Sequence, residues 1–266
     1  MTIDRCTFSY AVSDGLRYQN ASGSFTNSTF SNNGRYPVWF KDWVSNPHHR
    51  TNTFTANGTN MIAMNGGHFE ESRTILKDNA EYLILNNVTV GKYNSVNRLT
   101  VEPGNTLNFA PGTGIQVALY SGWYYGGELY AVGKVDSLIT FKPQNNTAGG
   151  WTGIFFSDHS DWSGSNSQLK YCTVTKGGDY NIRLENTGSI TIENSVISYA
   201  VTDGLRYTAS SGSLDNNTIS NNGRYPLYLM DWSSAPVHTT NTFTSNGINY
   251  IAMSGGSYTS NYTVLK

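Results

Sequence analysis

Hydrophobic and polar residues alternate along most of this chain, and apolar anchor residues recur at a regular distance. Around each anchor the neighbours are small, polar or β-branched, which gives the period of two residues that is typical of a β-strand. Asn, Gly and Ser cluster between these segments as turn residues. The anchors are separated by 22 to 24 residues and are Phe8, Phe30 and Phe54 near the N-terminus and Val174, Ile197, Ile219 and Phe243 in the second half.

A helical pattern is missing from the sequence. Apolar residues do not follow the three-and-four spacing of an amphipathic helix over any long stretch, so we expect essentially no helix. Short strands that recur every 22–24 residues are typical of a parallel β-helix, in which stacking buries the apolar side of each coil. We predict an all-β fold, a single right-handed parallel β-helix (solenoid) of roughly eleven coils, about 50–55 Å long at ~4.8 Å per coil. A β-sandwich or a propeller is the alternative.

The first part of the chain returns at its end. Residues 1–77 align without gaps with residues 190–266, and 44 of these 77 positions are identical. The segment Ser31–Pro37, for example, returns unchanged as Ser220–Pro226. Such a fixed period is typical of stacked or arrayed architectures. We expect residues 1–266 to form one continuous β-helix, in which 1–77 end one long repeat unit and 78–266 form a second, complete unit of 189 residues.

Composition and charge exclude several classes of partner. Charged residues make up 13% of the chain and the net charge is −1, whereas nucleic-acid binding needs a basic face. No run of 18 apolar residues occurs, so no membrane insertion is expected. Cys6 and Cys172 each precede an anchor by two residues, and we expect both to point into the core as unpaired thiols.

One acidic cluster is a candidate metal site. Asp158 and Asp161 flank His159 in a predicted loop, where two aspartates can bind Ca²⁺ weakly or contact a sugar. A polar turn rich in Asx residues is the alternative. We expect no other cofactor.

The charged pairs that recur in both copies have two interpretations. Asp14 and Arg17, which return as Asp203 and Arg206, form an ion pair if a turn brings them together. Arg35, which returns as Arg224, stands in a predicted corner before a tyrosine. A structural role for its guanidinium, on turn carbonyls or on the neighbouring ring, is favoured over catalysis.

The single-copy middle of the chain contains a series of strand-and-turn segments. They include Leu-Thr-Val-Glu-Pro-Gly from Leu99 and Gly-Gly-Trp-Thr-Gly-Ile-Phe-Phe from Gly149. This series resembles the secreted right-handed parallel β-helix repeat proteins of the pectate-lyase-like superfamily, of the surface-repeat or adhesin type. The resemblance covers nearly the whole chain and implies the fold and an extracellular or cell-surface location. It implies either a polysaccharide lyase or hydrolase or a stalk, adhesin or carbohydrate binder, because a fold alone does not fix the function. The Asn-Thr-Asp, Asp-Asp, His-Gly and Arg-Ile-Lys motifs of pectin hydrolases do not occur here.

Aromatic residues make up 13% of the chain and suggest carbohydrate binding. Exposed rings can pack on the C–H face of a sugar, although rings that cap corners or stack along the rod are the alternative. The candidate carbohydrate-binding residues are Trp43, Trp123, Tyr124, Tyr125, Trp162 and Trp232.

We therefore expect a non-enzymatic extracellular or cell-surface module with a structural or adhesive role and weak polysaccharide binding. No catalytic residue is assigned. A polysaccharide lyase or glycoside hydrolase acting on an acidic polysaccharide is the alternative. Strand sequence at both ends predicts end-to-end self-association or contact with adjacent repeat units, because sheet edges recruit partners.

Overall fold

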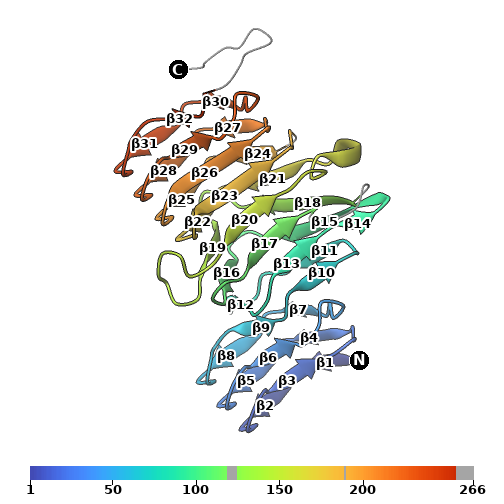
Figure 1. Ribbon diagram of the computed structural model, residues 1–266. Coiled ribbons are helices and arrows are strands. Elements are labelled where there is room, and N and C mark those ends of the chain that lie inside the picture. Colours follow the sequence, from blue (N-terminus) through green and yellow to red (C-terminus); the bar gives the residue numbers. More distant parts are fainter. Residues whose placement is uncertain (119–124, 189, 256–266) are drawn as a thin grey trace.

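The protein is a rod of stacked coils (Figure 1). The computed structural model describes residues 1–118, 125–188 and 190–255. Its strands pair in parallel, except for the short strand β14, and its longest sheet has ten strands, so the rod has about ten coils. This confirms the predicted parallel β-helix. Helical structure in the described residues is limited to the turn η1 (Trp162–Gly164), and none of it is long and apolar enough to cross a membrane.

Five sheets form the walls of the rod. Sheet A contains β1 (Thr2–Asp4), β4 (Ser24–Thr26) and β7 (His48–Arg50), and sheet B contains β2 (Thr7–Ser9), β5 (Thr29–Ser31) and β8 (Thr53–Thr55). Sheet C contains β3 (Leu16–Tyr18), β6 (Val38–Phe40), β9 (Ile62–Met64), β12 (Tyr82–Ile84), β16 (Thr106–Phe109), β19 (Ile139–Pro143), β22 (Cys172–Thr175), β25 (Val196–Ser198), β28 (Thr218–Ser220) and β31 (Thr242–Thr244). Sheet D contains β10 (Gly67–Phe69), β13 (Val88–Val90), β17 (Gly114–Val117), β20 (Gly153–Phe156), β23 (Tyr180–Glu185), β26 (Asp203–Thr208), β29 (Leu227–Leu229) and β32 (Ala252–Met253). Sheet E contains β11 (Arg73–Ile75), β14 (Lys92–Tyr93), β15 (Ser95–Val101), β18 (Tyr125–Val132), β21 (Ser167–Lys170), β24 (Ile190–Glu193), β27 (Ser213–Asp215) and β30 (Val237–Thr239).

The middle coils are longer than the period of the anchors predicts. Leu107 is in register with Phe141, and Thr140 with Thr173, so each of these coils uses more than 30 residues. The extra residues form loops outside the sheets. The rod therefore has about ten coils, where division by the short period gives roughly eleven.

The predicted anchors form the core. Phe8, Phe30 and Phe54 stack on one another in sheet B, with ring centroids 5.0 Å and 5.5 Å apart. Val174, Ile197 and Ile219 are buried in register in sheet C. Each apolar side chain thus covers the same position on the coils above and below, which is why a single coil cannot bury its own apolar side.

Asparagine side chains stack in a second, polar series at the corners of the coils. Asn217 is buried, its Oδ1 accepts a hydrogen bond from the backbone N–H of Ser195 at 3.0 Å, and its Nδ2 donates to the carbonyl of Ile192 at 2.9 Å and to Oδ1 of Asn241 at 3.0 Å. Asn222 and Asn246 make the same contacts at another corner. These side chains satisfy corner backbone groups that no strand partner reaches.

Replacing Asn217 by alanine is expected to lower the free energy of unfolding by about 1–3 kcal/mol, because buried donors and acceptors lose their partners. Urea denaturation followed by circular dichroism measures the loss. Asn166→Ala, at an exposed position, is the control and should change stability by less than about 0.5 kcal/mol. Equal stability of the two variants would show that the asparagine series does not stabilise the stack.

The two cysteines differ in their environment. Cys172 is buried, and burial raises the pKa of its thiol. Cys6 is exposed, so the prediction that it points into a covered core is wrong. Its backbone N–H donates to Oγ of Ser28 on the next coil, which places it at the equivalent corner position. Because it lies on the first coil, no coil covers its other side in the structure.

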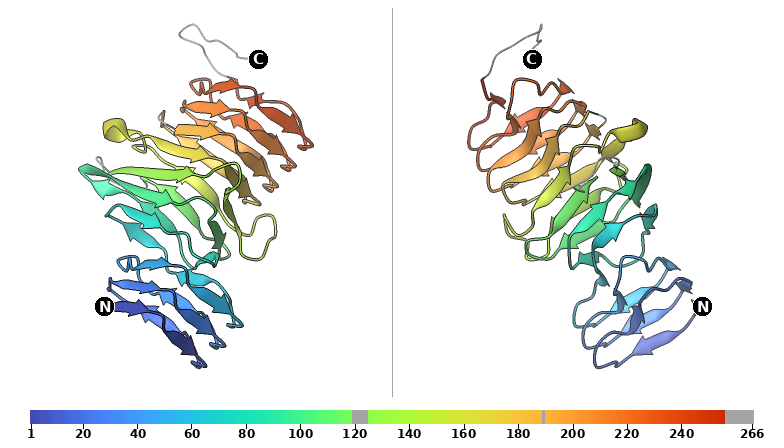
Figure 2. Two further views of the ribbon diagram at one scale, coloured as in Figure 1. Left: turned by 180° about the vertical axis from the view of Figure 1, so that it is seen from behind. Right: turned by 45° about the vertical axis from the view of Figure 1, so that its right-hand side comes forward.

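The stack of coils has a step near residue 65, which we call the junction. Sheets A and B end with β7 and β8, sheets D and E begin with β10 and β11, and sheet C continues across through the pairing of β9 with β12. The repeat makes β3 equivalent to part of β26, yet the two strands lie in sheets C and D. The first three coils are therefore displaced by one face, and Figure 2 shows them to the side of the remaining coils in its right-hand view.

Candidate functional site

The predicted aromatic residues do not converge on one surface within the described residues. Trp123 and Tyr124 lie outside the residues that the structure describes. Tyr125 begins β18, with its ring centroid 5.5 Å from that of Tyr93. Trp162 approaches the same strand at Gly126 from η1. These rings form one group, whereas the two remaining candidates lie on other coils.

The two remaining tryptophans lie in equivalent loops of the two copies. Trp43 is half-buried and packs against Gly67, where any side chain would collide with its ring. Trp232 is 36% exposed. Trp43 therefore fills space at the junction, and carbohydrate binding by any of the six aromatic residues stays a prediction.

The acidic pair Asp158 and Asp161 does not form a common site. Asp158 is exposed and its carboxylate lies 3.6 Å from Nδ1 of His159. Asp161 accepts a hydrogen bond from the backbone N–H of Gly188 at 2.7 Å, so it closes a turn. The described part of the chain contains no group of three or more acidic, histidine or cysteine ligands. Calcium binding at these residues stays a prediction.

A charged cluster recurs in both copies of the repeat, and we call the first one the N-terminal cluster. The carboxylate of Asp14 is buried and accepts hydrogen bonds from Arg17 at 2.8 Å and from Nε and Nη2 of Arg35 at 2.9 Å and 2.7 Å. Burial would raise the pKa of Asp14, but the hydrogen bonds from Arg35 and Arg17 outweigh it and lower the pKa. The guanidinium of Arg35 also lies over the rings of Tyr36 and Trp39, at 4.8 Å and 4.5 Å.

The C-terminal cluster repeats this arrangement. Asp203 is buried and accepts hydrogen bonds from Arg206 at 2.6 Å and from Nε and Nη2 of Arg224 at 2.8 Å and 2.6 Å. Arg224 lies over Tyr225 and Tyr228, at 4.9 Å and 5.0 Å. Both ways of stabilising these arginines that the sequence suggests, an ion pair and a neighbouring ring, are thus present.

The local sequence explains how the clusters form. The aspartate precedes a glycine, and a Cβ atom on Gly15 would lie 2.7 Å from Nδ2 of Asn33 and 2.8 Å from the carbonyl oxygen of Pro37. A glycine is therefore needed for the two coils to approach this closely. Arg35 reaches Asp14 because it follows the Asn-Asn-Gly corner of the next coil. The sequence analysis missed this contact, although the separation of Asp14 and Arg35 equals about one coil in both copies.

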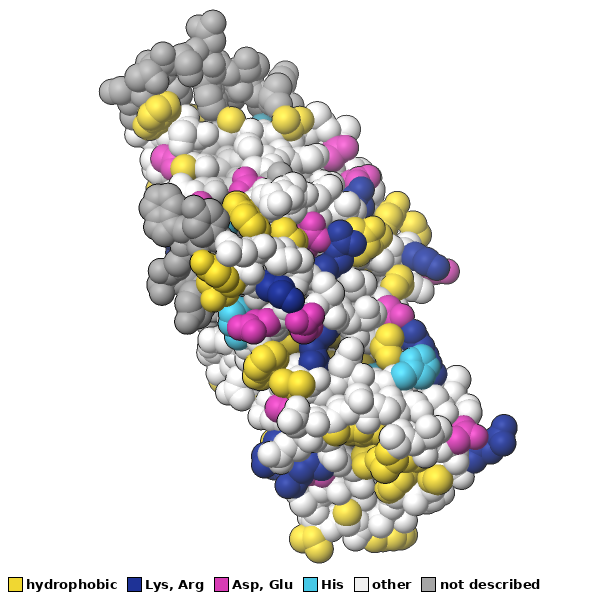
Figure 3. All heavy atoms as spheres, turned by 90° about the vertical axis from the view of Figure 1, so that its right-hand side faces the viewer, with side chains coloured by type: hydrophobic (Ala, Val, Ile, Leu, Met, Phe, Trp, Pro, Cys, Tyr) yellow, Lys and Arg dark blue, Asp and Glu magenta, His cyan; other side chains and the backbone are white. Residues whose placement is uncertain are grey.

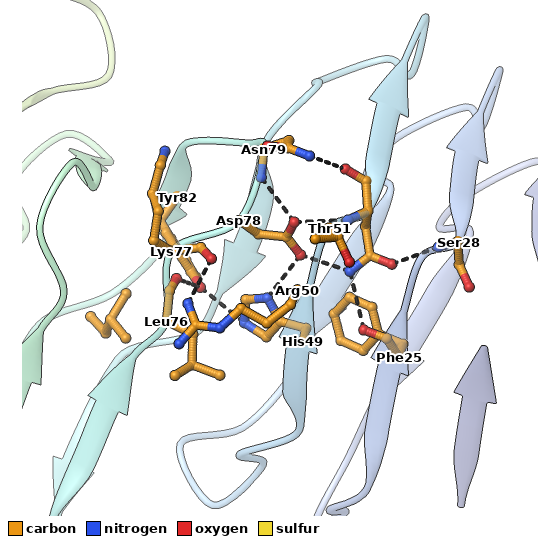
Figure 4. Close-up of polar contacts among 12 residues, drawn as sticks. Phe25, Ser28, His49, Arg50, Thr51, Leu76, Lys77, Asp78, Asn79 and Tyr82 are labelled. Atoms are coloured by element: carbon orange, nitrogen blue, oxygen red, sulfur yellow. Dashed lines mark hydrogen bonds and ion pairs between the residues drawn. The ribbon is translucent and has the colours of Figure 1, made fainter. Parts of the chain in front are cut away.

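A buried polar network joins the coils across the junction (Figure 4). The carboxylate of Asp78 contacts Nδ1 of His49 at 3.1 Å and accepts hydrogen bonds from the backbone N–H groups of Asn52 and Asn79, at 3.0 Å and 2.9 Å. Nδ2 of Asn52 donates to the same carboxylate at 2.7 Å. Nε2 of His49 lies 3.0 Å from the hydroxyl of Tyr82. Asp78 thus replaces the asparagine that continues the corner series elsewhere.

A second link lies beside this network. Arg50 contacts Glu102 through Nη1 and Nη2, at 2.5 Å and 2.6 Å, and Nη1 also donates to the carbonyl of Lys77. The hydrogen bonds from Arg50 lower the pKa of Glu102, and burial opposes them. Together these contacts close the junction on one side.

On its other side the junction opens into a groove of about 700 Å³. The groove lies between the edges formed by β7 and β11 and is lined by side chains that include His48, Arg73, Arg98 and Glu128. Figure 3 shows this side of the rod, where basic, acidic and histidine side chains gather mainly around the middle and much of the remaining surface is uncharged.

Comparison with known proteins gives one family and one partial relative. The sequence model described as "Right handed beta helix region" matches residues 1–121 and 104–265. "Protein bark beetle" of Drosophila melanogaster is 34% identical over 85 residues, which are 32% of this chain and 2% of that protein. The chain thus spans only a small part of the length of this relative. No solved structure matches the chain.

Proposed function

Because this chain belongs to the right-handed β-helix family, we propose that it is a structural repeat module of an extracellular or cell-surface protein that binds polysaccharide without cleaving it. The observation that supports binding is the recurrence of one arginine–aromatic cluster in both copies. Only 44 of 77 positions are identical between the copies, yet the aspartate, both arginines and the stacked rings are all retained as residue types.

The chemistry of the clusters favours an acidic polysaccharide. Each cluster combines two guanidinium groups with one carboxylate and so has a net positive charge. Arg35 and Arg224 use Nε and Nη2 to hold the aspartate, which leaves Nη1 without a hydrogen-bond acceptor among the described residues. A guanidinium fixed by a carboxylate and a ring is preorganised to donate to a carboxylate or sulfate group.

Duplication gives the module two sites on one rod. Two weak sites on a rigid scaffold raise the avidity for a polymer far above the affinity of either site. This fits a role in holding an extended polysaccharide. The aspartates of the clusters are fully engaged by arginines, so they support the clusters rather than act on a glycosidic bond.

The end coils fit a modular role as well. Phe8 and Phe243 are only half-buried and lie in strands on the terminal coils of the described rod. Adjacent repeat units or a second copy of this chain would cover these rings and pair with the exposed strand edges.

Binding of polygalacturonate and of chondroitin sulfate, with neutral dextran as the comparison polymer, tests the proposal. Lysine at Arg35 or Arg224 keeps a charge beside the aspartate but lacks the second nitrogen that the ligand needs. Each single variant, Arg35→Lys or Arg224→Lys, should bind the acidic polymer about 3- to 10-fold more weakly, and the double variant at least about 100-fold more weakly.

The control is Arg5→Lys, at an exposed arginine outside both clusters, and it should bind like the unaltered protein. The same samples are assayed for new reducing ends and for unsaturated products. Turnover of any polymer would support the lyase or hydrolase alternative and overturn the proposal. Unchanged binding by the double variant would show that the clusters only hold the coils together.

A further inference from the structure

The junction groove contains an arginine that differs from all the others. All nine arginines lie in the described residues, and eight of them have a carboxylate within 4.0 Å. Arg73 has none. Its Nη1 donates to the carbonyl of Ser45 at 2.8 Å and its guanidinium lies 5.3 Å from the ring centroid of Phe69.

Arg73 is also partly removed from water. The side chain lies on the edge strand β11 in register with the buried Leu99, so it is directed between the coils. Burial lowers the pKa of Arg73, and the charge of Asp42 opposes this shift. A half-buried cation without a counter-ion is unfavourable, and an anion that enters the groove would relieve this cost.

The other charged groups of the groove leave this position open. Arg98 contacts Glu128, with 2.6 Å between Nε and Oε2, and the other carboxylate oxygen of Glu128 accepts the backbone N–H of Asn166 at 2.8 Å. Both oxygens of the buried Glu128 are thus occupied. With Arg73, Arg98 and Glu128, the groove has a net positive charge.

The uncharged lining suits a sugar. Asn46, Ser72, Thr74 and Thr100 contribute amide and hydroxyl groups, which donate and accept hydrogen bonds as sugar hydroxyls require. The volume of about 700 Å³ lies within the range of small-molecule sites. An oligosaccharide of a few residues therefore fits the groove in size and polarity.

We propose that the junction groove binds an anionic sugar residue, whose carboxylate or sulfate group pairs with Arg73. This site is distinct from the two arginine–aromatic clusters and lies where the repeat is interrupted. The second copy has Tyr262 at the position equivalent to Arg73, so the binding residue belongs to one copy only.

Calorimetric titration of the full chain with trigalacturonate, a sulfated disaccharide, inorganic sulfate and maltotriose tests the proposal. The unaltered protein should bind at least one of the two acidic sugars at least 10-fold more tightly than neutral maltotriose and than inorganic sulfate. Arg73→Gln, whose amide can still donate to Ser45, should lose at least 10-fold in affinity for that sugar. Arg73→Lys should retain part of the affinity, because it retains the charge.

Two comparisons separate this site from the proposed function. The Arg35→Lys, Arg224→Lys double variant should bind the acidic oligosaccharide unchanged, even though its binding of the polymer is lost. Thermal unfolding without ligand shows whether Arg73→Gln is folded, and Arg73→Lys replaces it if it is not. Equal affinity of the unaltered protein and the Arg73 variants, equal binding of inorganic sulfate, or no binding of either acidic sugar would overturn the proposal.

Discussion

Asp78→Ala is expected to lower the free energy of unfolding by about 3–5 kcal/mol, the cost of removing one partner from a buried ionic network. The carboxylate has no exposed surface and contacts His49, both nitrogens of Asn52 and the backbone of Asn79. Alanine leaves these donors buried without an acceptor. Chemical denaturation at neutral pH measures the loss.

Two further variants identify the cause of this loss. Asp78→Asn keeps one oxygen for the backbone N–H groups and should lose less stability than Asp78→Ala. Asp136→Ala, at an exposed position, should change stability by less than about 0.5 kcal/mol. If Asp78→Ala were as stable as Asp136→Ala, the network would not hold the junction together.

The same carboxylate predicts a dependence on pH. Burial would raise the pKa of Asp78, but hydrogen bonds from His49, Asn52 and Asn79 outweigh it and lower the pKa. A lowered pKa means that the carboxylate contributes its full stability above the ordinary value of about 3.9. This contribution is lost as the pH falls through the lowered pKa. Asp78→Ala should therefore lose less stability on acidification than the unaltered protein.

Trp151→Ala should lower the free energy of unfolding by about 3–5 kcal/mol, as is usual for a large aromatic residue removed from a core. The side chain is 1% exposed and stacks on Phe109 with ring centroids 4.6 Å apart. Its Nε1 also donates to the carbonyl of Thr175 at 2.9 Å. The substitution creates a cavity and leaves that carbonyl without its partner.

Thermal and urea unfolding of Trp151→Ala measure this effect. Tyr250→Ala is the matched control, because it removes an aromatic ring that is 77% exposed. The control should stay within about 0.5 kcal/mol of the unaltered protein. A loss below about 1 kcal/mol for Trp151→Ala would mean that the long middle coils repack around the cavity.

The spacing of the anchors was sufficient to predict the fold, because each coil of this architecture needs one apolar residue at the same place. It failed where that repetition ends. Cys6 occupies a corner position on a coil that has no neighbour on one side, and alternation alone cannot show this. The junction was missed because Asp78 and Tyr82 belong to the single-copy segment, where the repeat offers no comparison.

The candidate sites were predictable only in part. The recurrence of Asp14 and Arg17 pointed to an ion pair, and the structure contains it. The contact between Asp14 and Arg35 joins two coils, so it depends on the exact stacking of the corners. The groove could not be predicted at all, because Arg73 is unusual only through the absence of a nearby carboxylate in three dimensions.

The junction also affects how the rod carries load. Elsewhere in the described rod, three hydrogen-bonded ladders connect one coil to the next, whereas across the junction only the pairing of β9 with β12 does so. The buried contacts of Asp78 and the link between Arg50 and Glu102 supply the remaining adhesion. In a solenoid, cooperativity passes only between neighbouring coils. Residues 1–64 are thus a mechanical segment of their own, coupled in series to the remaining coils by one ladder and a few side chains.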